Sequence, residues 1–164
     1  YPDEAIPFFD KGLDYAYRPE RCIQKVALLC NRLIAKAYCF DKIPENELIK
    51  VMNLIFDNKE LMNIPFISAR YAMNIIVLAL SQSKELGVLL IEKYPIESLI
   101  QRAFNDNILG AGQLLIQMNI VEKQYNIQIL DKLILPSHYI KTTGVRKEFL
   151  AKTGYNPFIF STWF

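Results

Sequence analysis

Residues 74–80 read NIIVLAL, in which Asn74 is the one polar side chain among six apolar ones. The apolar positions Ala69, Ala72 and Ile76 lie three and four residues apart, which indicates a helix. Six consecutive apolar residues cover every side of a helix, because one turn holds about 3.6 residues. A helix that is apolar all round is sandwiched between neighbours, so this stretch predicts an interior helix of a layered helical fold.

The helical spacing continues through most of the chain. It recurs at Val26, Leu29 and Leu33, and again at Leu48 and Val51. No sustained alternation of apolar and polar residues indicates a strand, and the Asn-Gly and Asp-Gly pairs of tight hairpins are absent from the sequence. The sequence therefore predicts an all-α protein.

Helix boundaries are marked by proline and serine. Pro65 predicts the start of a long helix, because proline is well tolerated in the first helical turn. Ser83 is the expected N-cap of a helix that begins at Lys84, and Pro95 separates that helix from the next. A further short helix is expected at residues 127–135.

Three segments share one outline, in which a short helix and a turn precede a longer helix. Matching alanines, Ala27, Ala72 and Ala111, are 45 and 39 residues apart. These spacings fit repeats of about 40–47 residues, so we expect the three alanines to be equally buried. The expected repeats span roughly residues 6–40, 43–82, 83–120 and, in part, 121–164.

Three stretches resemble armadillo and HEAT repeats. Residues 83–100, SKELGVLLIEKYPIESLI, resemble the opening of an armadillo repeat, and residues 145–159, VRKEFLAKTGYNPFI, show the same outline with a glycine in the turn. Residues 24–31, QKVALLCN, resemble the third helix of that family. The resemblance implies a right-handed superhelical α-solenoid of about three to four repeats. We expect residues 1–164 to be a single fragment of a longer chain.

Composition argues against several classes of function. Nineteen Lys and Arg residues against seventeen Asp and Glu residues leave a net charge of +2, which is too balanced for a nucleic-acid-binding protein. The longest uncharged stretch, residues 107–121, is shorter than the ~20 residues of a membrane span. One histidine, His138, and three cysteines provide little for catalysis, so no catalytic, cofactor-binding or metal-ligating residue is expected.

The three cysteines, Cys22, Cys30 and Cys39, lie close together in the sequence without a Cys-x-x-Cys motif. Such an odd set is typical of small apolar residues in a reducing compartment. We therefore expect an intracellular protein, either cytoplasmic or nuclear.

The resemblance implies a protein-binding function. In the family, the third helices of successive repeats line a concave groove that binds another protein or a peptide segment. The residues that match by position are Asn31, Arg70, Asn74, Gln113 and Gln117. Residues four apart share a helical face, so we expect Arg70 and Asn74 to be exposed near Gln113 or Gln117 of the next repeat. An equally simple interpretation is that these polar side chains only face solvent.

The sequence thus favours a non-catalytic interaction module that serves as a scaffold or adaptor. One alternative is a structural subunit buried in a large multiprotein assembly, which the apolar C-terminal run at residues 158–164 would suit. A second alternative is an all-α enzyme, which would need titratable groups that converge on a pocket.

Overall fold

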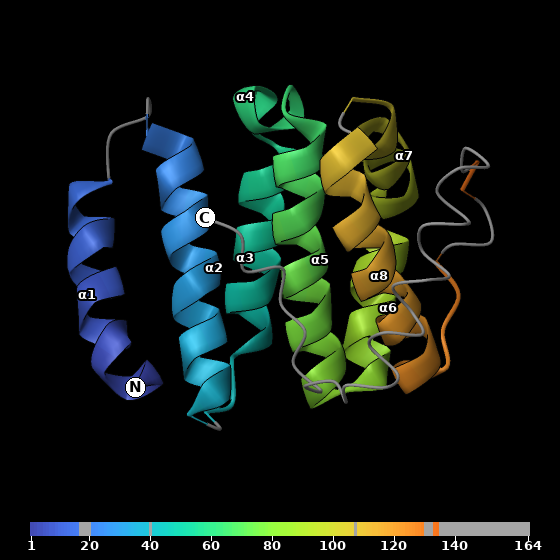
Figure 1. Ribbon diagram of the computed structural model, residues 1–164. Helices are drawn as coiled ribbons and strands as arrows, with labels where there is room; N and C mark the ends of the chain where they lie inside the picture. Colours follow the sequence, from blue (N-terminus) through green and yellow to red (C-terminus); the bar gives the residue numbers. More distant parts are fainter. Residues whose placement is uncertain (17–20, 40, 107, 130–132, 135–164) are drawn as a thin grey trace.

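The computed structural model describes residues 1–16, 21–39, 41–106, 108–129 and 133–134. Within these residues the chain forms eight helices and no strand, which confirms the all-α prediction. The helices are α1 (Pro2–Tyr15), α2 (Cys22–Tyr38), α3 (Glu45–Phe56), α4 (Lys59–Met62), α5 (Pro65–Gln82), α6 (Lys84–Lys93), α7 (Ile96–Asp106) and α8 (Ile108–Tyr125). Figure 1 shows them following one another across the molecule, from α1 at one end to α6, α7 and α8 at the other.

Helix α5 forms the centre of this arrangement. It contacts α2, α3, α4, α6, α7 and α8. Thirteen of its eighteen residues are buried, including all of residues 74–80. Burial of apolar surface stabilises a fold by about 25 cal/mol per Å², so this helix carries a large share of the stabilisation. The prediction of an interior helix is confirmed.

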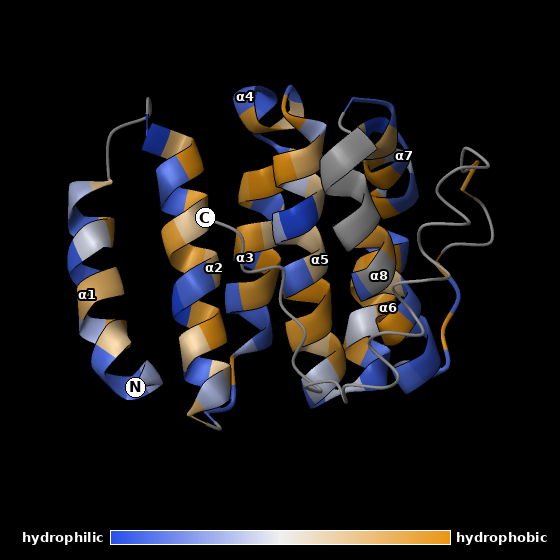
Figure 2. Cartoon of the chain, viewed as in Figure 1, coloured by the Kyte–Doolittle hydropathy of each residue, from blue (hydrophilic) through white to orange (hydrophobic). Residues whose placement is uncertain are grey.

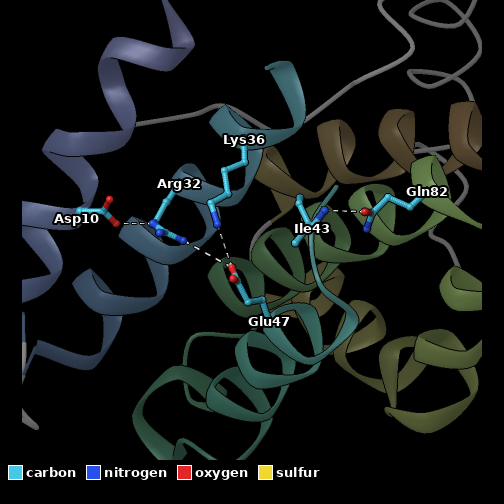
Figure 3. A network of polar contacts seen from close by, with 6 residues as sticks. All are labelled: Asp10, Arg32, Lys36, Ile43, Glu47 and Gln82. Atoms are coloured by element: carbon cyan, nitrogen blue, oxygen red, sulfur yellow. Dashed lines mark hydrogen bonds and ion pairs between the residues drawn. The ribbon is translucent and has the colours of Figure 1, made fainter. Parts of the chain in front are cut away.

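The ends of α5 follow the sequence signals. Pro65 occupies the first turn of α5, where a backbone N–H would have no helical partner. The side chain of Ser83 accepts a hydrogen bond from a backbone N–H in the first turn of α6 and caps that helix, as predicted. Pro95 lies between α6 and α7. At the end of α5, Gln82 Oε1 accepts from the backbone N–H of Ile43 at 2.8 Å and holds the segment between α2 and α3 (Figure 3).

A chain of ion pairs joins α1, α2 and α3 (Figure 3). Arg32 of α2 pairs through Nε with the carboxylate of Asp10 on α1. Its Nη1 also lies 3.5 Å from Oε2 of Glu47 on α3, and the Nζ of Lys36 lies 3.6 Å from the same oxygen. These four side chains are partly exposed, so the contacts add polar links at the edge of the apolar core.

Helix α8 ends at Tyr125 rather than near residue 120, where the third repeat was expected to end. Asn126 adopts a left-handed conformation with φ of 50°, which asparagine tolerates and which stops a helix. The N–H of Ile127 then donates to the carbonyl of Glu122 at 3.2 Å. The short helix predicted at residues 127–135 is wrong for its described residues, 127–129 and 133–134, which are not helical.

The prediction that the three matching alanines are equally buried is confirmed only for one of them. Ala72 is fully buried on α5, as expected, but Ala27 on α2 is partly exposed. The side chain of Ala111 lies outside the described ones. Helix α5 contacts six other helices, whereas α2 lies between α1 and the centre, so equivalent positions in the two helices are not buried to the same degree. Most of the expected partial repeat at residues 121–164 also lies outside the described residues.

Candidate functional site

Two predicted partner-binding residues meet inside the protein. Gln117 of α8 donates through Nε2 to Oδ1 of Asn74 on α5 at 3.1 Å, and each residue is 2% exposed. The predicted proximity of Asn74 and Gln117 is confirmed. The predicted exposure of Asn74 is wrong, because α8 packs over the face of α5 that carries it. A buried amide pair of this kind holds two helices together and cannot contact a partner in this arrangement.

The other predicted residues have different surroundings. Asn31 on α2 and Arg70 on α5 are partly buried. The guanidinium of Arg70 lies 5.6 Å from the centre of the ring of Tyr71, which is a cation–π contact. The side chain of Gln113 lies outside the described ones. The five predicted residues therefore do not come together as one exposed surface in the part of the chain that is described.

An open groove of about 560 Å³ lies between α2 and α3. Most of its lining comes from one face of α3, because the residues are spaced three or four apart. Lys25 contributes from α2, and two aliphatic side chains lie among the polar ones. The lining residues are Lys25, Asn46, Ile49, Lys50, Asn53, Leu54, Asp57 and Asn58.

Two aromatic residues fix the orientation of Asn53 in this groove. The hydroxyl of Tyr94, which follows α6, donates to Oδ1 of Asn53 at 2.6 Å. The ring of Tyr94 stacks on Phe56 with ring centres 5.1 Å apart, and burial raises the pKa of the Tyr94 hydroxyl. The hydroxyl therefore stays protonated and donates its hydrogen bond to the side-chain oxygen of Asn53. The amide Nδ2 group is then the donor that Asn53 can offer to a ligand.

Asn58 also lines the groove, but both of its polar atoms bind other parts of the fold. Its Oδ1 accepts from the N–H of Leu61 at 2.9 Å and caps α4. Its Nδ2 lies 2.9 Å from the sulfur of Cys22 on α2. Asn58 thus links α2 to α4 beside the groove, and the ligand-facing polar groups are those of α3 together with Lys25 and the carboxylate of Asp57.

The thiols near the groove are not activated. Burial raises the pKa of Cys22, and the charge of Glu60 raises it further. Burial also raises the pKa of Cys30, which is fully buried, and that of Cys39. A thiolate is the nucleophilic form, so these thiols stay protonated at neutral pH.

In the described part of the chain, no three His, Cys, Asp or Glu side chains come together in a way that could hold a metal ion. The single histidine, His138, lies outside the described residues. The groove can bind a ligand through amide and ammonium hydrogen-bond donors and through contact with the aliphatic side chains of Ile49 and Leu54.

This groove was not predicted from the sequence, although α3 carries a signal for it. Its buried face is Leu48, Val51, Met52 and Ile55, as the helical spacing predicts. Ile49 lies beyond that face among polar residues, together with Leu54. An aliphatic residue within a polar face is the signal, but only the position of α2 turns that face into a groove.

None of the described helices is both long and apolar enough to cross a membrane. Comparisons of this chain with protein-family models, with curated proteins and with solved structures found no match.

Proposed function

We propose that this chain is a non-catalytic protein-interaction module, an armadillo- or HEAT-like α-solenoid fragment that acts as a scaffold or adaptor. Two features support the solenoid: the helices succeed one another along one direction in Figure 1, and α5 is covered by neighbours on several sides. In a solenoid each repeat covers the one before it, which requires such interior helices.

The observation that carries the binding function is the groove between α2 and α3. An extended peptide needs partners for its backbone groups and apolar contact for its side chains. The groove provides the amide of Asn53, the ammonium groups of Lys25 and Lys50, and the aliphatic side chains of Ile49 and Leu54. We therefore place the partner site here instead of at the buried pair Asn74 and Gln117.

The cysteines support an intracellular setting. Cys22, Cys30 and Cys39 are free thiols, and no disulfide links them. Free cysteines persist in reducing compartments, which is consistent with a cytoplasmic or nuclear scaffold.

A peptide selection tests this function. Random twelve-residue peptides are selected on the purified chain, and the affinity of a selected peptide is measured by fluorescence anisotropy. We expect Asn53→Ala and Lys50→Ala each to weaken binding about two- to tenfold, which corresponds to the loss of one hydrogen bond or charged contact. The matched controls are Asn63→Ala and Lys123→Ala, which change exposed residues away from the groove. Selection of no peptide, or equal losses in groove and control variants, would contradict the proposal.

A structural subunit of a larger assembly is the second candidate, and α1 provides the observation that favours it. Tyr1, Phe8 and Tyr15 are 94%, 75% and 64% exposed. They are seven residues apart, so they share one outer face at the end of the helical array. Aromatic residues are enriched at protein interfaces.

Sizing of the isolated chain separates the two candidates. A monomer at all concentrations favours the interaction module. Association that Phe8→Ser abolishes favours the buried subunit, because the substitution removes the largest apolar group of that face.

A further inference from the structure

The side-chain amide of Gln101 on α7 binds both backbone groups of one residue far along the chain. Its Nε2 donates to the carbonyl oxygen of Ile134 at 3.1 Å, and its Oε1 accepts from the N–H of Ile134 at 2.9 Å. A neighbouring strand would make the same two contacts to an extended residue. The side chain of Ile134 is 81% exposed, so Gln101 recognises the backbone and not the isoleucine.

The described residues that follow α8 differ in how far their side chains are buried. Ile127 is partly buried, Ile129 is buried and Leu133 is partly buried against the core, whereas Gln128 and Ile134 are exposed. Leu133 thus packs an aliphatic side chain against the core directly before the residue whose backbone Gln101 binds.

A second side chain also binds the backbone of this segment. The N–H of Ile129 donates to the carboxylate of Glu122 on α8. Figure 1 shows the segment after α8 (orange) leaving the end of that helix at the side of the molecule away from α1. Side-chain groups of α7 and α8 are therefore bound to the backbone of Ile134 and of Ile129.

We propose that the face of α7 around Gln101 is a docking site for a peptide segment in which an aliphatic residue precedes a residue with both backbone groups available. Residues 133–134 are its internal ligand. The site is separate from the groove between α2 and α3, because Gln101 and the α3 face belong to different elements. The two Gln101 bonds are exposed to solvent. Water can replace exposed bonds at little cost, so a partner peptide can displace the internal ligand.

The partner chemistry follows from what the internal ligand uses. It needs an aliphatic side chain that packs as Leu133 does, followed by a residue with both backbone groups available. A proline at that second position is excluded, since it has no N–H. The Gln101 amide is neutral, so Gln101 itself selects no charge on the partner.

The first test uses the chain's own sequence as the probe. A labelled peptide with the sequence of residues 129–137, ILDKLILPS, is titrated with the full chain and followed by fluorescence anisotropy. Ile134→Pro in the full chain removes the N–H that Gln101 binds and weakens the internal ligand. We expect this variant to bind the peptide at least fivefold more tightly than the unsubstituted chain. Ile134→Ala keeps the backbone groups and should bind as the unsubstituted chain does.

The second test changes the probe and leaves the protein intact. A peptide methylated on the nitrogen equivalent to that of Ile134 cannot donate to Gln101, so its affinity should fall about two- to tenfold. Gln101→Ala should lower the affinity of the unmethylated peptide to a similar degree. Gln24→Ala, on an exposed position of α2, should leave it unchanged.

Two results would overturn the proposal. One is that Ile134→Pro binds the peptide no more tightly than the unsubstituted chain, which would make residues 133–134 a permanent part of the fold. The other is that methylation of the peptide leaves its affinity unchanged. The methylated peptide involves no substitution in the protein, so a folding defect cannot imitate its effect.

Discussion

Thirteen of the eighteen residues of α5 are buried, whereas every one of the fourteen residues of α1 is exposed or only partly buried. The sequences of the two helices account for this difference. Residues 74–80 of α5 have apolar side chains on all sides, while α1 alternates an apolar face with acidic and aromatic exposed positions. In Figure 2 much of α1 has pale colours, whereas much of α3 and α5 has the hydrophobic colour.

The comparison separates two ways in which a helix is held. Helix α5 is held by apolar neighbours on several sides, and its loss would open the whole core. Helix α1 is held by α2 through one face and through the ion pair of Asp10 with Arg32. The four predictions that follow test this difference, from the largest expected effect to the smallest.

The largest effect is expected from truncation inside α5. Leu78 is fully buried, so Leu78→Ala should lower the free energy of unfolding by about 2–5 kcal/mol, from lost burial and the cavity left behind. Leu13→Ala in α1 is the matched change at a partly buried leucine, and it should cost about 1 kcal/mol. Urea unfolding measures both. Equal losses would show that α1 contributes to the core as much as α5 does.

The buried amide pair should give the next effect. Asn74→Ala removes the acceptor that Gln117 uses, and an unsatisfied buried donor costs about 1–3 kcal/mol. A double-mutant cycle with Gln117→Ala should show a coupling energy of about 0.5–3 kcal/mol. The control, Asn63→Ala at an exposed position, should stay within about 0.5 kcal/mol. A loss of that small size for Asn74→Ala would mean that the pair does not join α5 to α8.

The sequence predicted α5 well because every signal there is local. Six apolar residues in a row require cover on all sides, and Pro65 and Ser83 mark the boundaries through their own backbone chemistry. The all-α class follows from the same periodicity. These features depend on the order of residues within one helix and on nothing farther away.

The candidate site could not be predicted in the same way, because it depends on neighbours. Asn74 was expected at the surface, yet a polar residue within an apolar helix is covered together with its neighbours, here by α8. The α3 groove exists because α2 lies beside Ile49 and Leu54 without covering them. Periodicity identifies the polar and apolar faces of a helix but not the distance between two helices.

Two glycines compare how tightly a helix packs against α5 and how tightly α1 packs against α2. A Cβ atom on Gly87 of α6 would lie 2.2 Å from Cδ2 of Leu80 on α5, which is buried and cannot move aside. Overpacking costs about 1–3 kcal/mol, and the helix propensity of alanine returns about 1 kcal/mol, so Gly87→Ala should lose about 1 kcal/mol net.

Gly12→Ala in α1 should be neutral or stabilising by contrast. Its Cβ would lie 3.1 Å from Cδ2 of Leu28, a partly exposed leucine of α2 that can shift by a few tenths of an ångström. Helix propensity then favours alanine by up to about 1 kcal/mol. Thermal unfolding of the two variants measures the difference. A loss for Gly12→Ala as large as that for Gly87→Ala would show that α1 packs as tightly as α5.

The smallest effect is expected from the ion pair that links α1 to α2. The side chains of Asp10 and Arg32 are 49% and 22% exposed, and partly exposed pairs contribute about 0.2–1 kcal/mol. Asp10→Ala should therefore change global unfolding very little. Because α1 packs mainly on a single neighbour, α2, the local effect should be larger, and limited proteolysis within α1 should be faster at low salt. In 1 M NaCl the Debye length falls to about 3 Å, so the difference from the unsubstituted chain should shrink.

Asp14→Ala is the matched control, since Asp14 is an exposed acid on the same helix. Faster proteolysis for Asp10→Ala alone, removed by salt, would mean that charge holds the edge helix in place. Equal proteolysis of the two variants at low salt would instead mean that apolar packing on α2, and not the ion pair, holds α1 in place. The edge and the centre of the array would then be held by the same force and differ only in how many neighbours supply it.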